Sequence, residues 1–112
     1  MSSIALINDI FERVKGVKGI VVAGEDGLPI IERLEADIDP EEVSGQILAV
    51  INNIRSLGLG KVDEIFFNND RGILYYCKRT PDNYFLIALA SPEVIRGKLK
   101  FYLDILSSKI KI

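Results

Sequence analysis

The chain has 112 residues and a formal net charge of −2, with 14 basic and 16 acidic side chains. This length fits one domain with its own hydrophobic core, and a near-neutral charge without a basic stripe argues against nucleic-acid binding. Histidine is absent and there is one cysteine, which excludes Ser-His-Asp and Cys-His catalysis, disulfides within the chain and the usual zinc sites.

Residues 3–15 predict an amphipathic helix, because apolar residues recur at intervals of three and four. Ser2 or Ser3 is its N-cap, and Gly16 ends it. The apolar stripe consists of Ile4, Ile7, Phe11 and Val14.

Residues 19–34 predict a β-hairpin. Its first strand, residues 20–23, has no polar side chain, which is typical of a strand covered on both faces. Asp26 and Gly27 predict a two-residue type I′ turn. Pro29 cannot donate a hydrogen bond to a neighbouring strand, so the second strand is expected at a sheet edge.

A second helix is predicted from Asp39, its N-cap, and Pro40, its first residue, to about Leu57, where Gly58 follows. The predicted core face consists of Val43, Ile47, Val50, Ile51 and Ile54. The opposite face consists of Glu41, Gly45, Leu48, Ala49, Asn52 and Ser56. This second face has few long charged side chains, so it is either a plain solvated face or a surface that another backbone approaches closely.

Three strands joined by short turns follow, and then a third helix. The strands are predicted at residues 62–68, 73–78 and 84–90. The last strand is again apolar on both faces, and Cys77 is expected to be buried. Ser91 is the predicted N-cap of the third helix, Pro92 its first residue, and about Ser107 its end.

The predicted fold class is α+β, an α/β sandwich with the order α-β-β-α-β-β-β-α. The two strands that are apolar on both faces should lie in the centre, which gives a five-stranded antiparallel sheet with strand order 2-1-5-4-3. We expect the second helix alone on one face of the sheet and the other two helices on the opposite face.

The third strand is then an open edge. It contains Phe66 and Phe67 and neither proline nor lysine, with Asp63 and Glu64 as a partial guard. An apolar edge without blunting residues is a pairing site, so we expect a symmetric homodimer in which the second helices also meet. The predicted dimer or partner interface consists of Gly45, Leu48, Ala49, Asn52, Ser56, Glu64, Ile65, Phe66 and Phe67. The two phenylalanines should point to opposite faces of the sheet.

The whole chain resembles the Roadblock family, the dynein light-chain Roadblock type and its prokaryotic relatives. The resemblance lies in residues 14–19 (VKGVKG), the hairpin at 21–29 (VVAGEDGLP), the long second helix, the strand at 84–89 (YFLIAL) and residues 95–99 (IRGKL). It implies one Roadblock-like domain over residues 1–112. It also implies a homodimer formed by the third strand and second helix, a role in regulating a small Ras-like GTPase, and no catalytic centre.

No P-loop pattern occurs, so the chain itself should not bind a nucleotide. An arginine supplied to a GTPase could come from Arg55, Arg71 or Arg79, although each is expected to be solvated. The alternatives are a scaffold or adaptor subunit of a motor or polarity complex, and a small-molecule sensor. We expect no enzyme activity, cofactor or metal, no membrane span, and a cytoplasmic location.

Overall fold

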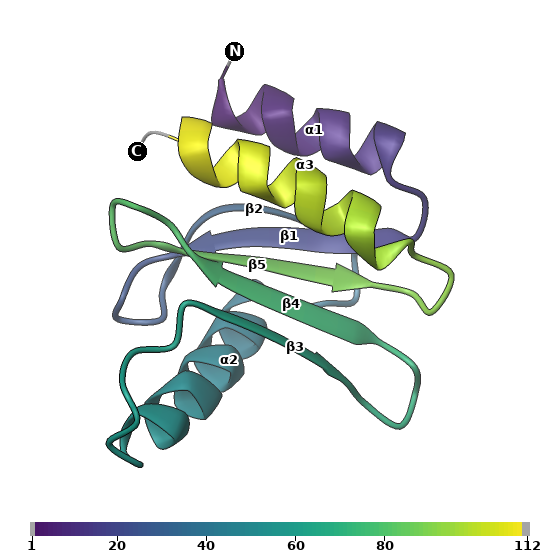
Figure 1. The fold of residues 1–112 in the computed structure, drawn as a ribbon. Helices are drawn as coiled ribbons and strands as arrows, with labels where there is room; N and C mark the ends of the chain where they lie inside the picture. Colours follow the sequence, from purple (N-terminus) through teal and green to yellow (C-terminus); the bar gives the residue numbers. More distant parts are fainter. Residues whose placement is uncertain (1, 111–112) are drawn as a thin grey trace.

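The computed structural model describes residues 2–110. In chain order, the elements are α1 (Ser3–Arg13), β1 (Val17–Ala23), β2 (Pro29–Leu34), α2 (Pro40–Arg55), β3 (Glu64–Asn68), β4 (Leu74–Arg79), β5 (Phe85–Ala90) and α3 (Arg96–Lys109). The antiparallel sheet has the order β2-β1-β5-β4-β3. Helices α1 and α3 cover one face and α2 lies on the other (Figure 1). The predicted class, strand order and helix placement are therefore confirmed.

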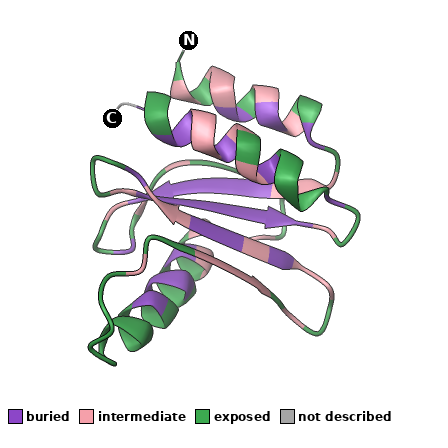
Figure 2. Ribbon diagram, viewed as in Figure 1, coloured by how far each residue is buried: buried purple, intermediate pink, exposed green. Residues whose placement is uncertain are grey.

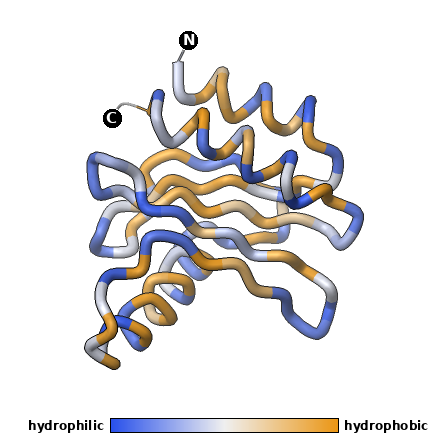
Figure 3. Tube along the Cα trace, viewed as in Figure 1, coloured by the Kyte–Doolittle hydropathy of each residue, from blue (hydrophilic) through white to orange (hydrophobic). Residues whose placement is uncertain are grey.

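The two central strands are buried on both faces, as predicted (Figure 2). In β1, Ile20 and Val22 pack in the core beneath α1 and α3, whereas Val21 and Ala23 pack in the core above α2. All four are 0% exposed. The hydrophobic colour of the central strands in Figure 3 shows why the sequence places them there. Because successive side chains of a strand point to opposite faces of the sheet, β1 contributes side chains to both cores.

The β1–β2 turn differs from the predicted two-residue type I′ turn. Gly27 has a positive φ of 82°, and Asp26 does not. The Gly27 amide donates to the Gly24 carbonyl at 3.0 Å, and the Asp26 carboxylate accepts from the Leu28 amide at 3.0 Å. Because Asp26 uses its side chain to hold a local turn, the strands are joined by a longer loop over residues 24–28.

Strand β2 carries features that blunt its edge. Pro29 begins it as predicted, and the register with β1 is irregular beside Ala23. Glu32 and Arg33 are exposed further along. These features oppose pairing with another strand.

Helix α1 ends at Arg13, earlier than predicted, and its buried stripe contains Ile7 and Val14 as predicted but differs from the prediction at Ile4 and Ile10. Ser2 caps it by accepting from the Ala5 amide at 3.2 Å. Ile4 is 63% exposed, whereas Ile10 is 3% exposed. The reason is that α1 packs against α3 as well as β1, so a residue between these two neighbours is buried.

Helix α3 begins at Arg96 and not at Pro92. Residues 91–94 form a separate turn in which the Val94 amide donates to the Ser91 carbonyl at 3.1 Å. The Ser91 amide donates to the Gly16 carbonyl at 2.8 Å. This bond to the α1–β1 connection holds the segment back from the helix, whose N-cap residue makes no side-chain capping bond.

Candidate interaction surface

One edge of the sheet, formed by β3, has no neighbouring strand among the described residues. Its partner on the other side is β4. Two backbone bonds bracket this ladder: the Arg79 amide donates to the Asp63 carbonyl at 2.8 Å, and the Asn69 amide donates to the Ile73 carbonyl at 3.1 Å. Residues 63 and 69 therefore direct their backbone groups toward β4.

Backbone groups alternate in direction along an antiparallel strand. Because residues 63 and 69 face β4, so do Ile65 and Phe67. Glu64, Phe66 and Asn68 consequently direct their N–H and C=O groups to the open edge. The strand thus offers a row of backbone donors and acceptors to another chain.

The two phenylalanines point to opposite faces, as predicted. Phe66 lies on the α3 face and meets Tyr76 edge-to-face, with ring centroids 4.1 Å apart. Phe67 lies on the α2 face and stacks on Tyr75 at 4.7 Å. Ile65 joins Phe67 in the α2-side core. All three β3 side chains are half-buried, so apolar surface remains at the edge.

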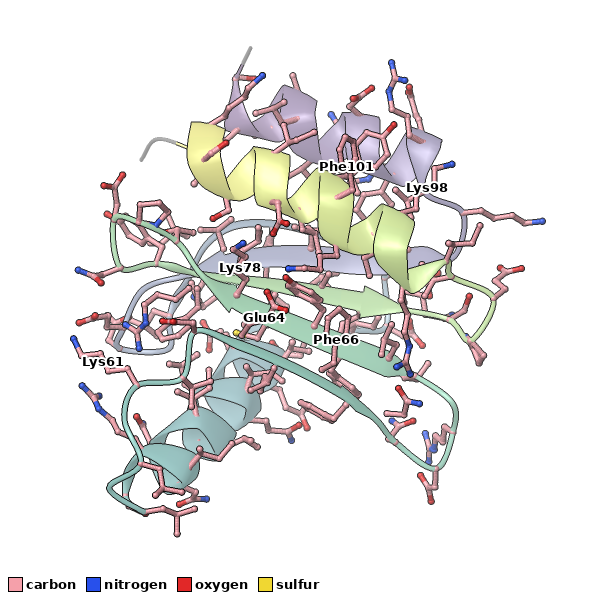
Figure 4. All side chains as sticks on the ribbon, in the orientation of Figure 1. Lys61, Glu64, Phe66, Lys78, Lys98 and Phe101 are labelled. Atoms are coloured by element: carbon pink, nitrogen blue, oxygen red, sulfur yellow. The ribbon has the colours of Figure 1, made fainter. Side chains whose placement is uncertain are left out.

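A cluster of charged and phenolic groups ties the β3 edge to α3. We call it the Glu64 cluster, and it consists of Glu64, Tyr76, Lys78, Lys100 and Asp104. The Glu64 carboxylate accepts from Lys100 Nζ and from the Tyr76 hydroxyl, both at 2.8 Å. Lys78 Nζ donates to Asp104 at 2.5 Å. Figure 4 shows Glu64, Lys78 and Phe66 between the sheet and α3. Glu64 is thus directed toward α3 and leaves the edge largely unguarded.

The electrostatics of the Glu64 cluster favour its charged forms. The hydrogen bond from Lys100 lowers the pKa of Glu64, and the hydrogen bond from Lys78 lowers the pKa of Asp104. Burial, followed by the bond to Glu64, raises the pKa of Tyr76. Glu64 and Asp104 are therefore carboxylates at neutral pH, and Tyr76 keeps its proton and acts as a hydrogen-bond donor.

Helix α2 is rolled relative to the predicted orientation. Ser44 is 0% exposed, and its hydroxyl donates to the Gly27 carbonyl at 2.6 Å. Leu48 is 6% exposed and packs beside Gly27. Val50 and Ile54 are 38% and 37% exposed. The prediction was therefore wrong for Leu48, placed on the partner face, and for Val50 and Ile54, placed in the core.

The roll has a physical reason. The Ser44–Gly27 bond draws one side of α2 toward the β1–β2 loop, and Leu48 follows one turn later. At 100° per residue, Val50 lies nearly opposite Leu48 on the helix. It therefore turns outward. Ile47 and Ile51 stay in the core as predicted.

The exposed side of α2 has small and apolar residues. Gly45, Ala49, Asn52 and Ser56 are exposed, in the positions predicted for them. A Cβ placed on Gly45 would meet nothing within 4 Å. The helix then leads into a loop with two further exposed leucines. We call the following set the α2 apolar surface: Val50, Ile54, Leu57 and Leu59, the last two 67% and 84% exposed.

The exposure of Leu57 and Leu59, which belong to the α2 apolar surface, is indicated by the sequence, although the helical period of apolar residues does not detect it. Leu57 and Leu59 alternate with Gly58 and Gly60 after the helix has ended. Neither leucine falls on the helical stripe or in a strand. Large apolar residues in such a loop have no core position to occupy, so the sequence pattern itself favours their exposure.

Arg79, one of the three arginines considered for a GTPase partner, is not a solvated turn residue. It ends β4, and its side chain is 14% exposed. The guanidinium lies 4.8 Å from the centre of the Phe85 ring, and Nη1 lies 3.5 Å from Glu25. Arg55 and Arg71 are exposed, as expected.

The described part of the chain offers little to other kinds of site. Within residues 2–110, His, Cys, Asp and Glu side chains form no group of three that could hold a metal ion. None of the described helices combines the length and the apolar character that a membrane crossing requires. Cys77 is buried as predicted, and burial raises the pKa of its thiol to about 12. A hollow of about 350 Å³ between α1 and β2 is open to solvent and lined by Ile4, Ile7, Asn8, Ile30, Ile31, Glu32 and Arg33.

Comparison with known proteins gives the fold. No protein-family model matches the sequence, and no curated protein matches it. Solved structures do match. A Roadblock/LC7 domain from Streptomyces avermitilis has a TM-score of 0.80 at 18% identity, covering 92% of this chain and 89% of that one. The gliding protein MglB from Thermus thermophilus has a TM-score of 0.79 at 10% identity, covering 95% and 83%. MglC from Myxococcus xanthus has a TM-score of 0.68 at 21% identity, covering 97% and 96%.

Proposed function

Since the chain has the Roadblock/LC7 fold, we propose that it is a non-enzymatic, homodimeric interaction module that binds and regulates a small Ras-like GTPase. In this proposal residues 1–112 act as one Roadblock-like domain. The dimer forms through the β3 edge and the exposed side of α2.

The observation that carries the homodimer is the bare β3 edge. Glu64, Phe66 and Asn68 have backbone groups without a partner strand in the described chain, and the half-buried Phe66 and Phe67 leave apolar surface beside them. Burial of that surface and of the α2 apolar surface would favour a dimer, with a gross contribution of about 25 cal/mol for each Å² of apolar area removed from water, against which stands the freedom that two chains lose on association. A small side chain at Ala49 and none at Gly45 leave room for a neighbouring helix.

The GTPase partner is supported by the sequence resemblance and by the likeness to a gliding protein, MglB. The chain has no P-loop of its own, so a nucleotide would be held by the partner. A module of this kind regulates hydrolysis by ordering the partner's residues. The largely buried Arg79 is poorly placed to reach into a partner, so that Arg55 and Arg71 remain as the exposed residues among the three candidate arginines.

Sedimentation equilibrium tests the homodimer. The wild type should be a dimer at micromolar concentration. Ala49→Glu, which puts a charge on the exposed side of α2, should weaken the dimer at least about tenfold, since burying an unpaired charge costs more than about 1.4 kcal/mol. Asn8→Glu adds the same charge to α1, on the other face of the sheet, and should leave the dimer intact. A wild type that stays monomeric would overturn the homodimer.

A second experiment tests the partner. Purified Ras-like GTPases from the same genome, loaded with GDP or with a non-hydrolysable GTP analogue, are titrated into the chain by calorimetry, and GTP hydrolysis is followed with and without it. Regulation predicts binding to one nucleotide state and a changed hydrolysis rate. Equal binding to both states without a rate change would favour the adaptor function, and no binding to any of them would overturn the GTPase proposal.

A further inference from the structure

We propose that two copies of this chain pair β3 with β3 in a single register, about a two-fold axis at Phe66, and that this register brings Arg96 and Asn68 of one copy against Glu64 of the other. The inference rests on the proposed homodimer. It goes further by naming which residues face each other, and it predicts an ion pair that the single chain does not contain.

The direction of the backbone groups restricts the possible registers. Glu64, Phe66 and Asn68 face the open edge, so each must lie opposite another outward-facing residue for both chains to form hydrogen bonds. If one β3 strand were shifted along the other by a single residue, its outward-facing N–H and C=O groups would lie opposite backbone groups that already form hydrogen bonds with β4. Antiparallel pairing centred on residue 65, 66 or 67 meets this condition.

Only the central one of these registers uses the whole strand. Centred on Phe66, the pairing sets Phe66 opposite itself and Glu64 opposite Asn68, so that all of β3 (residues 64–68) is matched. Centred on Ile65, it sets Asn68 opposite residue 62, before the strand. Centred on Phe67, it sets Glu64 opposite residue 70, in the β3–β4 turn. Both alternatives lose backbone bonds at the ends.

The side chains agree with the Phe66 register. On the α2 face, Ile65 of each copy lies opposite Phe67 of the other as a non-hydrogen-bonded pair, in which the Cα atoms approach to about 4.5 Å. Such apolar cross-strand pairs stabilise a sheet. On the α3 face, the two Phe66 rings meet at the axis.

Charge complementarity gives the second line of support. Arg96 Nη2 donates to Asn68 Oδ1 at 3.0 Å, so the guanidinium lies over the residue that faces Glu64 of the other copy. Cα atoms of such a hydrogen-bonded pair are about 5.5 Å apart, which puts the Arg96 guanidinium within ion-pair reach of that carboxylate. Lys100 already holds Glu64 in its charged form. The symmetric dimer contains this contact twice.

Cysteine cross-linking tests the register. The background is Cys77→Ala, because Cys77 lies directly opposite Ile65 on β4 and would capture a cysteine placed there. The three single variants are Ile65→Cys, Phe66→Cys and Phe67→Cys. In the proposed register the Cα atoms of the two residues 66 are about 5.5 Å apart, within disulfide range, whereas two residues 65 or two residues 67 are about 8 Å apart, outside it.

Under mild oxidation, Phe66→Cys should form a covalent dimer, and the other two variants should stay uncross-linked. Preferential cross-linking of Ile65→Cys or Phe67→Cys would overturn the register while leaving the homodimer standing. A monomeric wild type in sedimentation would instead overturn the homodimer itself. The two failures are therefore distinguishable.

A double-mutant cycle keeps the proposal testable if Phe66→Cys fails to fold. Dimer dissociation constants are measured for the wild type, Glu64→Gln, Arg96→Gln and the double variant. Two cross-strand charge contacts predict a coupling of about 2- to 30-fold between the substitutions. Independent effects, with a coupling of one within error, would overturn the predicted ion pair.

Discussion

The hydroxyl of Ser44 determines which side of α2 faces the sheet, and its removal is the sharpest test of that packing. Ser44→Ala deletes a buried hydrogen bond of 2.6 Å to the Gly27 carbonyl. The cavity is small, because only one oxygen is lost. The main effect is that the Gly27 carbonyl, within a buried residue, loses its side-chain donor.

The magnitude follows from three contributions. The lost bond and the unsatisfied carbonyl together cost about 1–3 kcal/mol. Alanine recovers about 0.5 kcal/mol through its helix propensity. We therefore expect the free energy of unfolding to fall by about 0.5–2.5 kcal/mol. With an unfolding entropy of about 2.1 cal/mol/K per residue, this corresponds to a decrease in Tm of about 2–11 °C.

Urea and thermal denaturation, followed by circular dichroism, measure this change. Protein concentration is held constant, because association shifts apparent stability. The control is Ser108→Ala, an exposed serine of α3 whose hydroxyl donates to the Ile105 carbonyl at 2.9 Å. It should change stability by less than about 0.5 kcal/mol. If Ser44→Ala and Ser108→Ala have the same stability, the Ser44 bond does not fix the roll of α2.

Three further predictions concern the Glu64 cluster, the cysteine and a glycine. The ion pair with Lys100 lowers the pKa of Glu64, so this group stabilises the fold above its usual pKa and loses that contribution as the pH falls through its lowered pKa. Glu64→Gln should therefore reduce the urea midpoint at pH 7 and much less at pH 3; an equal loss at both values would refute this. The Cys77 thiol, with a pKa raised to about 12 by burial, should react with a thiol-specific reagent at pH 8 only after unfolding in urea, and rapid labelling of the native chain would contradict its burial. In Gly19→Ala, the new Cβ would overlap Leu34 Cδ2. Because that methyl group ends a flexible, half-buried side chain, we expect a loss at the lower end of the range for overpacking, about 1 kcal/mol. Leu34→Ala in the same chain should restore part of it, and no loss in urea titrations would show that the leucine simply moves.

The strands and their order could be predicted because their signals are local. Ile20 and Val21 lie in a run without polar residues. A strand of this kind is stable only in the centre of a sheet that is covered on both faces. Pro29 excludes the next strand from the centre. The opposite directions of Phe66 and Phe67 follow from strand geometry alone. These inferences needed no knowledge of distant contacts.

The roll of α2 could not be predicted in the same way. Periodicity counts apolar side chains, and it therefore assigned Val50 and Ile54 to the core. The deciding contact is a polar one between Ser44 and Gly27, which are 17 residues apart in sequence. A buried serine bonded to a distant carbonyl looks like any surface serine in the sequence.

The prediction that α3 begins at Pro92 was wrong for a related reason. Ser91 and Pro92 have the local features of a helix N-terminus. The Ser91 amide is instead held by the Gly16 carbonyl, and Ile95 becomes the N-cap residue without a capping side chain. Local preference was overridden by a contact between segments far apart in the chain.

The unlike edges of the sheet limit how far association can proceed. β2 is protected by Pro29, by its irregular register and by the charges of Glu32 and Arg33, whereas β3 is bare. Once two bare edges have joined, both outer rims of the combined sheet are β2 strands. Growth strand by strand then stops after one addition, so the same hydrogen-bonding edge that serves recognition does not seed a fibril.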